Sequence, residues 1–229
     1  SVSAFLLNRS SDLSFALLHK KVYFLCNRMH KMNKSGIFVG KTGEKNMKTI
    51  ILNQRKERDE LGFSSVNTTK KFMDYLHEPY LFYYLPRYNN KLKLMKKAPR
   101  KVYVVDNGFV AAKAFSLSDN LGRLLENQVF VELIRRGYDT DKTMFYYRSR
   151  NDKEVDFILR KGTHIDRLVQ VCYDMSSPKT EKREVDSLTE CAEELKCSNL
   201  VIVTNDEERT IEKDGFKIDI VPVAKWGVS

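Results

Sequence analysis

The sequence has few of the residues that build disulfide frameworks or zinc sites. Its 229 residues include four cysteines and four histidines. Cys26, Cys172, Cys191 and Cys197 form no Cys-x-x-Cys pair, and none has a histidine nearby at metal-ligand spacing. This pattern argues against a disulfide-stapled secreted domain and against a structural zinc site. It favours a reduced, cytoplasmic chain.

A long hydrophobic run is also missing. The most apolar early stretch, residues 13–26, is interrupted by His19, Lys20 and Lys21. A helix that spans a bilayer needs about 20 consecutive apolar residues, so this stretch is too short and too charged. No basic segment followed by an apolar one opens the chain, so we expect no signal peptide. We predict a cytoplasmic protein that has no membrane partner.

Acidic residues are scarce in the first part of the chain. Up to Lys101 there are 21 Lys and Arg against 7 Asp and Glu, whereas from Val102 onward there are 19 against 23. The formal net charge of +10 therefore comes from the N-terminal part. A basic segment beside a near-neutral folded domain is typical of a protein that contacts a polyanion.

A complete phosphate-binding loop is absent too. Gly40, Lys41 and Thr42 end like a Walker A loop, but Ser35 stands where that motif has its first glycine. We predict a polar loop here and no ATP hydrolysis. Residues 1–46 show weak periodicity, and residues 1–60 are expected to form a poorly organised N-terminal segment.

What the sequence does contain, at residues 61–101, is the pattern of a small DNA-binding unit. Ser64 or Ser65 suits the N-cap of a helix that ends before Pro79, and an aromatic strand follows. Residues 86–101 then hold seven Lys and Arg and no acid. A helix followed by a basic ribbon is typical of a winged-helix module; a solvated basic loop is the alternative. The candidate nucleic-acid contacts are Lys70, Lys71, Arg87, Lys91, Lys93, Lys96, Lys97, Arg100 and Lys101.

Residues 102–229 are predicted to form an α/β domain. Glu126 lies on the face of its helix that should pack inward, where an unpaired charge costs several kcal/mol. It therefore needs a partner such as a metal or an arginine, or a route to an edge. Period-two alternation places Glu154 and Asp156 on one face of their strand. The expected elements are a strand at 101–106, a helix at 120–137, an antiparallel meander of strands at 143–149, 154–160 and 167–173, a helix at 179–196, and strands at 200–204 and 218–223.

This order of elements resembles the PD-(D/E)xK nuclease-like fold, with Glu126 in the helix, Asp156 in the second strand and Gln170-Val171-Cys172 in the third. Residues 101–227 more narrowly resemble the C-terminal domain of unknown function in certain prokaryotic AAA-type ATPases. The stretches that carry the resemblance include "KVYVVDNGF", "GRLLENQVFVELIRRG", "YYRSRNDKEVDFIL" and "LVQVCYD". The resemblance implies a restriction-endonuclease-like αβββαβ core, preceded at residues 61–101 by a small winged-helix-like basic segment.

The resemblance also implies that a module is missing. Residues 47–60 are similar to the extreme N-terminus of those ATPases, and they run directly into the linker at Leu61. The P-loop ATPase module is therefore expected to be absent between Glu60 and Leu61, as in an internally deleted or remnant member of the family. Residues 1–46 match no part of it.

By the same resemblance, Glu126 and Asp156 would bind Mg²⁺, and Gln170 would stand where the second strand acid belongs. Cys172 occupies the lysine position and is a cation in neither of its protonation states. A lysine at the start of the next helix, Lys179 or Lys182, is a possible substitute.

Three functions follow from these site residues. The favoured one is a module without catalysis that binds nucleic acid, DNA in particular, or docks another protein through the C-terminal domain. The second is an active Mg²⁺-dependent DNA nuclease with a displaced lysine, which would make Mg²⁺ its cofactor. The third is a remnant without function.

Overall fold

The structure is a computed structural model and describes residues 51–52, 64–77, 82–108 and 121–228. The predictions for residues 1–46, including the phosphate-loop-like segment, lie outside these ranges, and so does the junction between Glu60 and Leu61. In the part of the chain that is described, no helix is both long and apolar enough to cross a bilayer.

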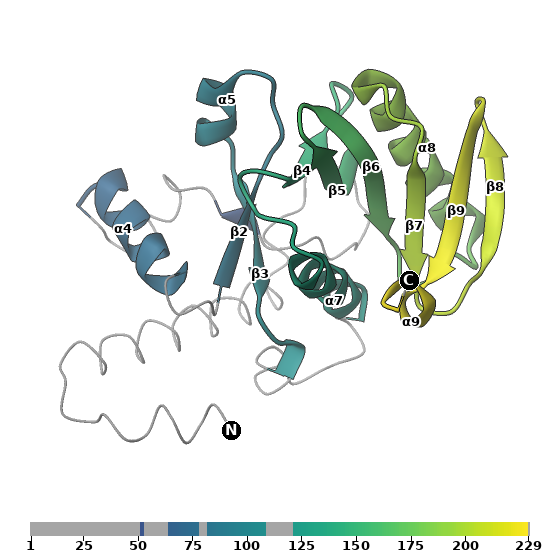
Figure 1. Cartoon of the computed structure of the whole chain (residues 1–229), viewed down its shortest axis with the longest axis horizontal. Helices are drawn as coiled ribbons and strands as arrows, with labels where there is room; N and C mark the ends of the chain where they lie inside the picture. The colour runs from purple at the N-terminus through teal and green to yellow at the C-terminus, as the bar shows by residue number, and fades with distance from the viewer. Residues whose placement is uncertain (1–50, 53–63, 78–81, 109–120, 229) are drawn as a thin grey trace.

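A six-stranded mixed sheet forms the centre of the molecule, in the order β4-β5-β6-β7-β9-β8 (Figure 1). β4, β5 and β6 are antiparallel neighbours, which confirms the predicted meander. β7 and β9 continue the sheet in parallel with β6, and β8 returns antiparallel beside β9. The strands are β4 (Met144–Arg148), β5 (Glu154–Lys161), β6 (His164–Val171), β7 (Leu200–Thr204), β8 (Arg209–Lys213) and β9 (Phe216–Pro222).

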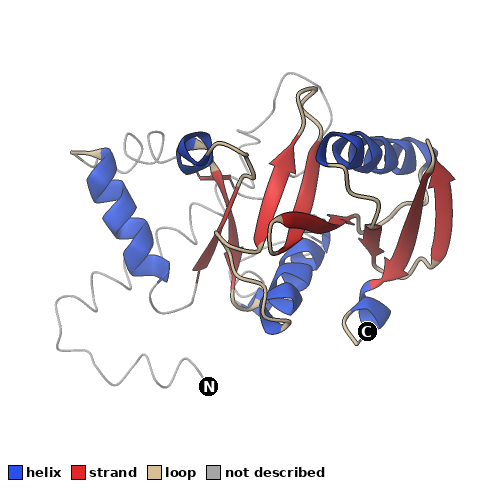
Figure 2. Cartoon of the chain, turned by 45° about the horizontal axis from the view of Figure 1, so that its top comes forward, coloured by secondary structure: helices blue, strands red, loops and turns tan. Residues whose placement is uncertain are grey.

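Helices cover both faces of this sheet (Figure 2). α7 (Leu121–Arg135) buries Phe130 and Leu133 in one core cluster, together with Phe157 of β5. α8 (Pro178–Leu195) buries Leu188 in the second cluster, with Leu168 of β6 on the other face. Each such side chain contributes about 1.5–3 kcal/mol when it leaves water. The short α9 (Val223–Trp226) joins the α7 side. The predicted helices and the mixed α/β class are therefore confirmed.

The sequence patterns missed the hairpin between β8 and β9. Asp214 and Gly215 connect the two strands, with φ angles of 52° and 79°. Two consecutive residues at positive φ are what a tight two-residue hairpin requires, and Asp-Gly is a preferred pair for it. The hairpin adds an antiparallel edge strand beyond the parallel strands.

A second, three-stranded antiparallel sheet lies beside the large one, in the order β1-β3-β2. The segment expected to be a basic ribbon contains a short helix, α5, between its strands. Ser65 acts as the N-cap of α4, because the Thr68 N–H donates to Ser65 Oγ over 3.1 Å. The elements are β1 (Ile51–Leu52), α4 (Val66–His77), β2 (Phe82–Pro86), α5 (Leu92–Lys97) and β3 (Arg100–Val104).

The two sheets share a core. The ring of Tyr103 on β3 stacks on Phe130 of α7 with 4.2 Å between centroids. Past the end of β2, the Tyr88 N–H donates to the Tyr146 carbonyl of β4 over 2.7 Å. The Tyr146 hydroxyl donates in turn to the Pro99 carbonyl, also over 2.7 Å. The small sheet thus covers the outer edge of β4, and β3 runs across residues 101 and 102, where the sequence suggested a domain boundary.

Asn127 of α7 holds β3 in place. Its side-chain oxygen accepts the Val104 N–H over 2.8 Å, and its amide donates to the Val104 carbonyl over 3.0 Å. The same amide donates to Asn107 Oδ1 over 2.9 Å. A side-chain amide with this pairing replaces a neighbouring strand, so the buried peptide groups of β3 remain satisfied next to a helix.

We expect Asn127→Ala to lower the free energy of unfolding by about 2–4 kcal/mol, because it leaves a buried N–H and a buried carbonyl without partners. Gln128→Ala is the matched control, since Gln128 is the exposed neighbour on the same helix; its effect should stay within about 0.5 kcal/mol. Urea unfolding monitored by circular dichroism measures both values. Equal effects of the two substitutions would contradict this role of Asn127.

Candidate functional site

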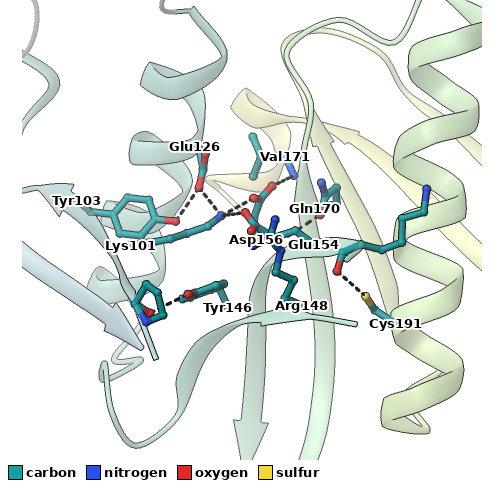
Figure 3. A network of polar contacts seen from close by, with 12 residues as sticks. Lys101, Tyr103, Glu126, Tyr146, Arg148, Glu154, Asp156, Gln170, Val171 and Cys191 are labelled. Carbon is teal, nitrogen blue, oxygen red and sulfur yellow. Dashed lines mark hydrogen bonds and ion pairs between the residues drawn. The ribbon is translucent and has the colours of Figure 1, made fainter. Parts of the chain in front are cut away.

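The ammonium group of Lys101 lies where three carboxylates meet (Figure 3). Lys101 Nζ is 2.7 Å from Asp156 Oδ1, 3.0 Å from Glu126 Oε1 and 3.1 Å from Glu154 Oε1. The Lys101 side chain is 0% exposed. Lysine is almost never fully buried unless it is paired, so these carboxylates are what keeps it inside. We refer to Lys101, Glu126, Glu154 and Asp156 as the carboxylate cluster.

Three separate elements supply this cluster. β3 contributes Lys101 and, two residues on and therefore on the same face, Tyr103. The Tyr103 hydroxyl donates to Glu126 Oε1 over 2.7 Å. Glu126, on the inward face of α7, thus has the partners that its position required, and Lys101 and Tyr103 are among them.

A bulge in β5 aims Asp156 at the cluster. Phe145 of β4 pairs with Ile158, and Tyr147 pairs with Val155, so one residue of β4 stands opposite two of β5. Val155 and Ile158 both pack on the α8 side, while Phe157 packs on the α7 side. Bulges re-aim side chains in this way. Glu154 and Asp156 converge as predicted. The regular alternation on which this prediction rested is interrupted at Asp156 by the bulge.

Within the cluster, one ammonium faces three carboxylates. Burial by itself would lower the pKa of Lys101, but the Asp156 and Glu126 carboxylates outweigh it, and this pKa lies well above its usual value. Burial raises the pKa of Asp156 to about 7. The Lys101 ammonium lowers this pKa, but by less than burial raises it, and the Glu126 carboxylate raises it further. The Asp156 carboxyl therefore keeps its proton to a higher pH than an exposed aspartate does.

Gln170 does not join the carboxylates, contrary to the role that the resemblance gave it. Alternation along β6 points its side chain to the α8 face. There its amide donates to Glu184 Oε2 over 2.7 Å, and its oxygen accepts the Asp156 N–H over 3.2 Å. The neighbouring Val171 N–H donates to Asp156 Oδ2 over 3.0 Å. Gln170 therefore positions the Asp156 backbone.

Cys172 also faces α8, within the core cluster on that side. Burial raises the pKa of its thiol to about 12, and the Glu184 carboxylate adds to the effect. The thiol is therefore neutral near pH 7, and it does not belong to the carboxylate cluster around Lys101. The lysine that reaches the carboxylates comes from β3, and not from Lys179 or Lys182 at the start of α8, both of which are exposed.

The nine residues predicted to contact nucleic acid differ in their exposure. Lys101 is buried in the carboxylate cluster, which corrects its assignment to a binding surface. Arg87 and Arg100 are half-buried and hold the two sheets together, since Arg87 Nη2 donates to the Arg148 carbonyl over 2.9 Å and Arg100 lies 3.6 Å from Asp141. The residues that remain exposed are Lys70 and Lys71 on α4 and Lys91, Lys93, Lys96 and Lys97 at α5.

The carboxylate cluster in this arrangement does not fit Mg²⁺. Mg²⁺ requires oxygen ligands at about 2.0–2.1 Å in near-ideal octahedral geometry. Here the carboxylate oxygens surround Lys101 Nζ, which takes the central position. Across the described ranges, no group of three or more His, Cys, Asp or Glu side chains is placed to hold a metal ion.

Comparison with known proteins gives a family match for the C-terminal part. Residues 121–226 match the model described as a domain of unknown function (DUF4143). This agrees with the resemblance of residues 101–227 to a domain of unknown function. The matched residues include Glu126, Glu154 and Asp156 but not Lys101, which lies on β3 before the matched region.

Two relatives are similar over a longer part of the chain, and both are described as uncharacterised proteins. One, from Methanocaldococcus jannaschii, is 33% identical over 164 residues, which cover 69% of this chain and 35% of the relative. The other, from Haemophilus influenzae, is 31% identical over 163 residues, which cover 71% of this chain and 37% of the relative. The chain thus spans little more than a third of the length of either relative.

A solved structure of Thermococcus gammatolerans McrB AAA+ hexamers with bound McrC aligns with 96% of this chain and 66% of that one. The identity is 10% and the TM-score 0.30. A score this low does not assign a fold.

We expect Lys101→Met to destabilise the protein by about 3–5 kcal/mol, the usual cost of removing one partner of a buried ion pair. Lys97→Met is the matched control, because Lys97 lies four residues earlier in the same basic run and is exposed. It should change the free energy of unfolding by less than about 0.5 kcal/mol. Urea unfolding at pH 7 measures both. A Lys101→Met protein as stable as Lys97→Met would show that the cluster does not depend on the ammonium.

The raised pKa of Asp156 predicts a pH-dependent stability of definite sign. Because the folded state holds this proton up to about pH 7, and an unfolded Asp loses it near pH 4, unfolding releases a proton between these values. The contribution of Asp156 to stability therefore falls as pH rises through this window, by up to about 1.4 kcal/mol per pH unit.

The comparison of wild type with Asp156→Asn isolates this contribution, since other titrating groups are common to both proteins. The wild-type free energy of unfolding, minus that of the variant, should decrease from pH 5 to pH 7. A difference that is flat, or that increases with pH, would contradict the assignment.

Proposed function

We propose that this chain is a nuclease-like module without catalysis that binds nucleic acid through the exposed lysines of α5. The order α7, β4, β5, β6, α8, β7 supports a restriction-endonuclease-like core, because it matches the αβββαβ order of that fold. The observation that carries the non-catalytic part of the proposal is the burial of Lys101 among Glu126, Glu154 and Asp156.

Metal-dependent cleavage of a phosphodiester needs carboxylates that bind a divalent ion, and it needs a cation that reaches the developing charge on the phosphate. In this cluster the carboxylates are already occupied by Lys101 Nζ, at 2.7–3.1 Å. Their side chains are only 11–16% exposed, and the ammonium is not exposed at all. A phosphate could not touch the ammonium unless β3 moved. The cluster is therefore better suited to stabilising the fold than to cleavage.

The nucleic-acid part of the proposal rests on α5 and the residue before it. Lys91, Lys93, Lys96 and Lys97 are exposed together on six-residue α5 and its N-cap. Within the described residues, none of these four lysines forms an ion pair with a carboxylate. The helix lies beyond the ends of β2 and β3 (Figure 1), and its Met95 packs against the core cluster on the α8 side of the large sheet. Exposed, clustered lysines of this kind neutralise phosphates and release counterions.

DNA is the polyanion that this part of the fold favours. α4, β2, α5 and β3 retain the helix-then-ribbon order of a winged-helix segment, with α5 placed between the two ribbon strands. In such a unit a helix approaches a groove while the strand connection touches the backbone. Lys70 and Lys71 on α4 and the lysines of α5 would then bind phosphates from two sides.

One observation favours a second function, that of an active Mg²⁺-dependent nuclease. Lys101 Nζ lies 2.7 Å from Asp156 Oδ1, so a displaced lysine is present next to a nuclease-like acid. This function requires metal-dependent nicking of supercoiled plasmid that disappears in Asp156→Ala. The non-catalytic function predicts no nicking by wild type in Mg²⁺ or Mn²⁺, and nicking that Asp156→Ala abolishes would overturn it.

The binding prediction compares two sets of four lysines that change the net charge equally. Replacing Lys91, Lys93, Lys96 and Lys97 by alanine should weaken binding to a short DNA duplex at least tenfold at low salt. It should also flatten the salt dependence, by up to about 0.9 in d log K/d log[salt] for each lysine–phosphate pair that the substitutions remove. Fluorescence anisotropy across a salt series measures both quantities.

The control set is Lys161, Lys182, Lys217 and Lys225, which are exposed on the C-terminal domain. Replacing them by alanine should leave most of the affinity and the salt slope in place. Equal effects of the two sets would show that only overall charge matters. An absence of salt-dependent binding to DNA by wild type would favour the remnant without function.

A further inference from the structure

We infer that α5 prefers DNA in which an unpaired strand adjoins a duplex, and that Leu92 and Leu94 contact sugars and bases of the unpaired strand. This inference rests on the proposed function, because it specifies the form of DNA that the α5 lysines bind. It also gives a role to two exposed leucines that the binding of phosphates does not explain.

The first support is the exposure of both leucines on one six-residue helix. Leu92 is 59% exposed and Leu94 is 50% exposed. The other large hydrophobic side chains that are exposed in the described part of the chain all lie outside α5. Single apolar side chains at a surface are ordinary, but two on one short basic helix form a feature of the lysine surface itself.

Helical geometry places the two leucines on opposite sides of the lysines. Met95 marks the inward direction, because it packs against the core cluster on the α8 side. At about 100° per residue, Lys93 and Lys97 point away from the protein, opposite Met95. Leu94 then lies on one flank of these lysines and Leu92 on the other. We refer to these two lysines and two leucines as the α5 ridge.

Both ends of α5 are fixed by one residue of β4, which keeps the ridge in place. Before the helix, the Tyr88 N–H donates to the Tyr146 carbonyl over 2.7 Å. After it, the Tyr146 hydroxyl donates to the Pro99 carbonyl over 2.7 Å. The Ala98 N–H also donates to the Leu94 carbonyl over 3.0 Å, which closes the last turn. The helix is therefore held with its leucines toward solvent.

The charge of the α5 ridge selects the class of partner. The helix contains no acidic residue, and within the described ranges Lys93 and Lys97 form no ion pair with a carboxylate. A line of phosphates is the complementary surface. A membrane fits less well, because a helix that lies on a bilayer turns its apolar side toward the lipid, whereas the outermost side chains of α5 are lysines.

The flanking leucines select the form of the DNA. In a paired duplex the bases are stacked inside, so lysines that meet the backbone have only phosphate and sugar beside them. Along an unpaired strand, the sugars and the faces of the bases are accessible on either side of the phosphates, and side chains that pack on them add affinity. Cations in the middle with apolar side chains on both flanks match this second surface.

The test uses the full chain and compares a paired duplex with a duplex that has the same number of nucleotides but ends in an unpaired arm. By fluorescence anisotropy, wild type should bind the armed duplex at least about fivefold more tightly, the gain expected from packing on one or more bases. Leu92→Ala combined with Leu94→Ala should remove this preference. The affinity for the paired duplex and its salt dependence should not change, because every lysine remains.

Leu121→Ala combined with Val228→Ala is the matched control, since it removes two exposed hydrophobic side chains outside α5. This control should keep the preference for the armed duplex. A fluorescent adenine analogue in the arm gives a second readout of contact. Its emission should change when wild type or the control binds, and should not change when the variant without the two α5 leucines binds.

The outcomes separate this inference from the proposed function. Equal binding of the two DNAs by wild type, or equal weakening of both by the α5 leucine substitutions, would overturn the inference and leave the proposed function intact. Absence of salt-dependent binding to either DNA would contradict the proposed function, and the inference with it. Binding of wild type to vesicles of phosphatidylserine and phosphatidylcholine, lost in the α5 leucine variant and without a preference for the armed duplex, would make α5 a lipid contact and also overturn the inference.

Discussion

The ammonium of Lys101 and the three carboxylates around it are the interaction on which the rest of the structure depends. An ion removed from water must be balanced by neighbours, and here the neighbours come from α7 and β5 while the ion comes from β3. The pairing therefore joins elements that are distant in the sequence. It fixes the position of the small sheet, and it gives Glu126 a reason to face inward.

The same constraint divides the basic segment at residues 86–101 into a part that packs on the large sheet and a part that stays exposed. Arg87, Arg100 and Lys101 are turned toward the large sheet, where they hold backbone carbonyls and carboxylates. The lysines at α5 lie between these anchors and remain exposed. Strands β2 and β3 thus cover the edge of β4, and α5 presents its lysines to solvent. The positive charge of this segment is therefore divided between buried contacts with the large sheet and exposed lysines at α5.

Much of the fold could be predicted from periodicity, and the parts that could not depend on tertiary contacts. β7 has the predicted bounds because Leu200–Thr204 is an almost wholly apolar run, which suits a strand buried on both faces. β8 was missed because its residues are mostly charged, although Asp214-Gly215 was an available hairpin signal. The inward position of Glu126 correctly indicated a missing partner. Its identity was hidden, because Lys101 is one of seven basic residues in a run and nothing local marks it as the buried one. The bulge at Asp156 likewise exists only through pairing with β4.

The surroundings of Gln170 and Cys172, at the end of β6 and just past it, explain why both positions hold neutral residues. Gln170 both donates to Glu184 and accepts from the Asp156 N–H, and a glutamate could accept but not donate. A carboxylate at 170 would also lie against that of Glu184, where two like charges in a buried place raise each other's free energy. A lysine at position 172 would have to enter the apolar core beneath α8, where Cys172 fits as a small uncharged side chain. Positions 170 and 172 thus hold neutral residues, and the cation beside Glu126, Glu154 and Asp156 comes from β3 as Lys101.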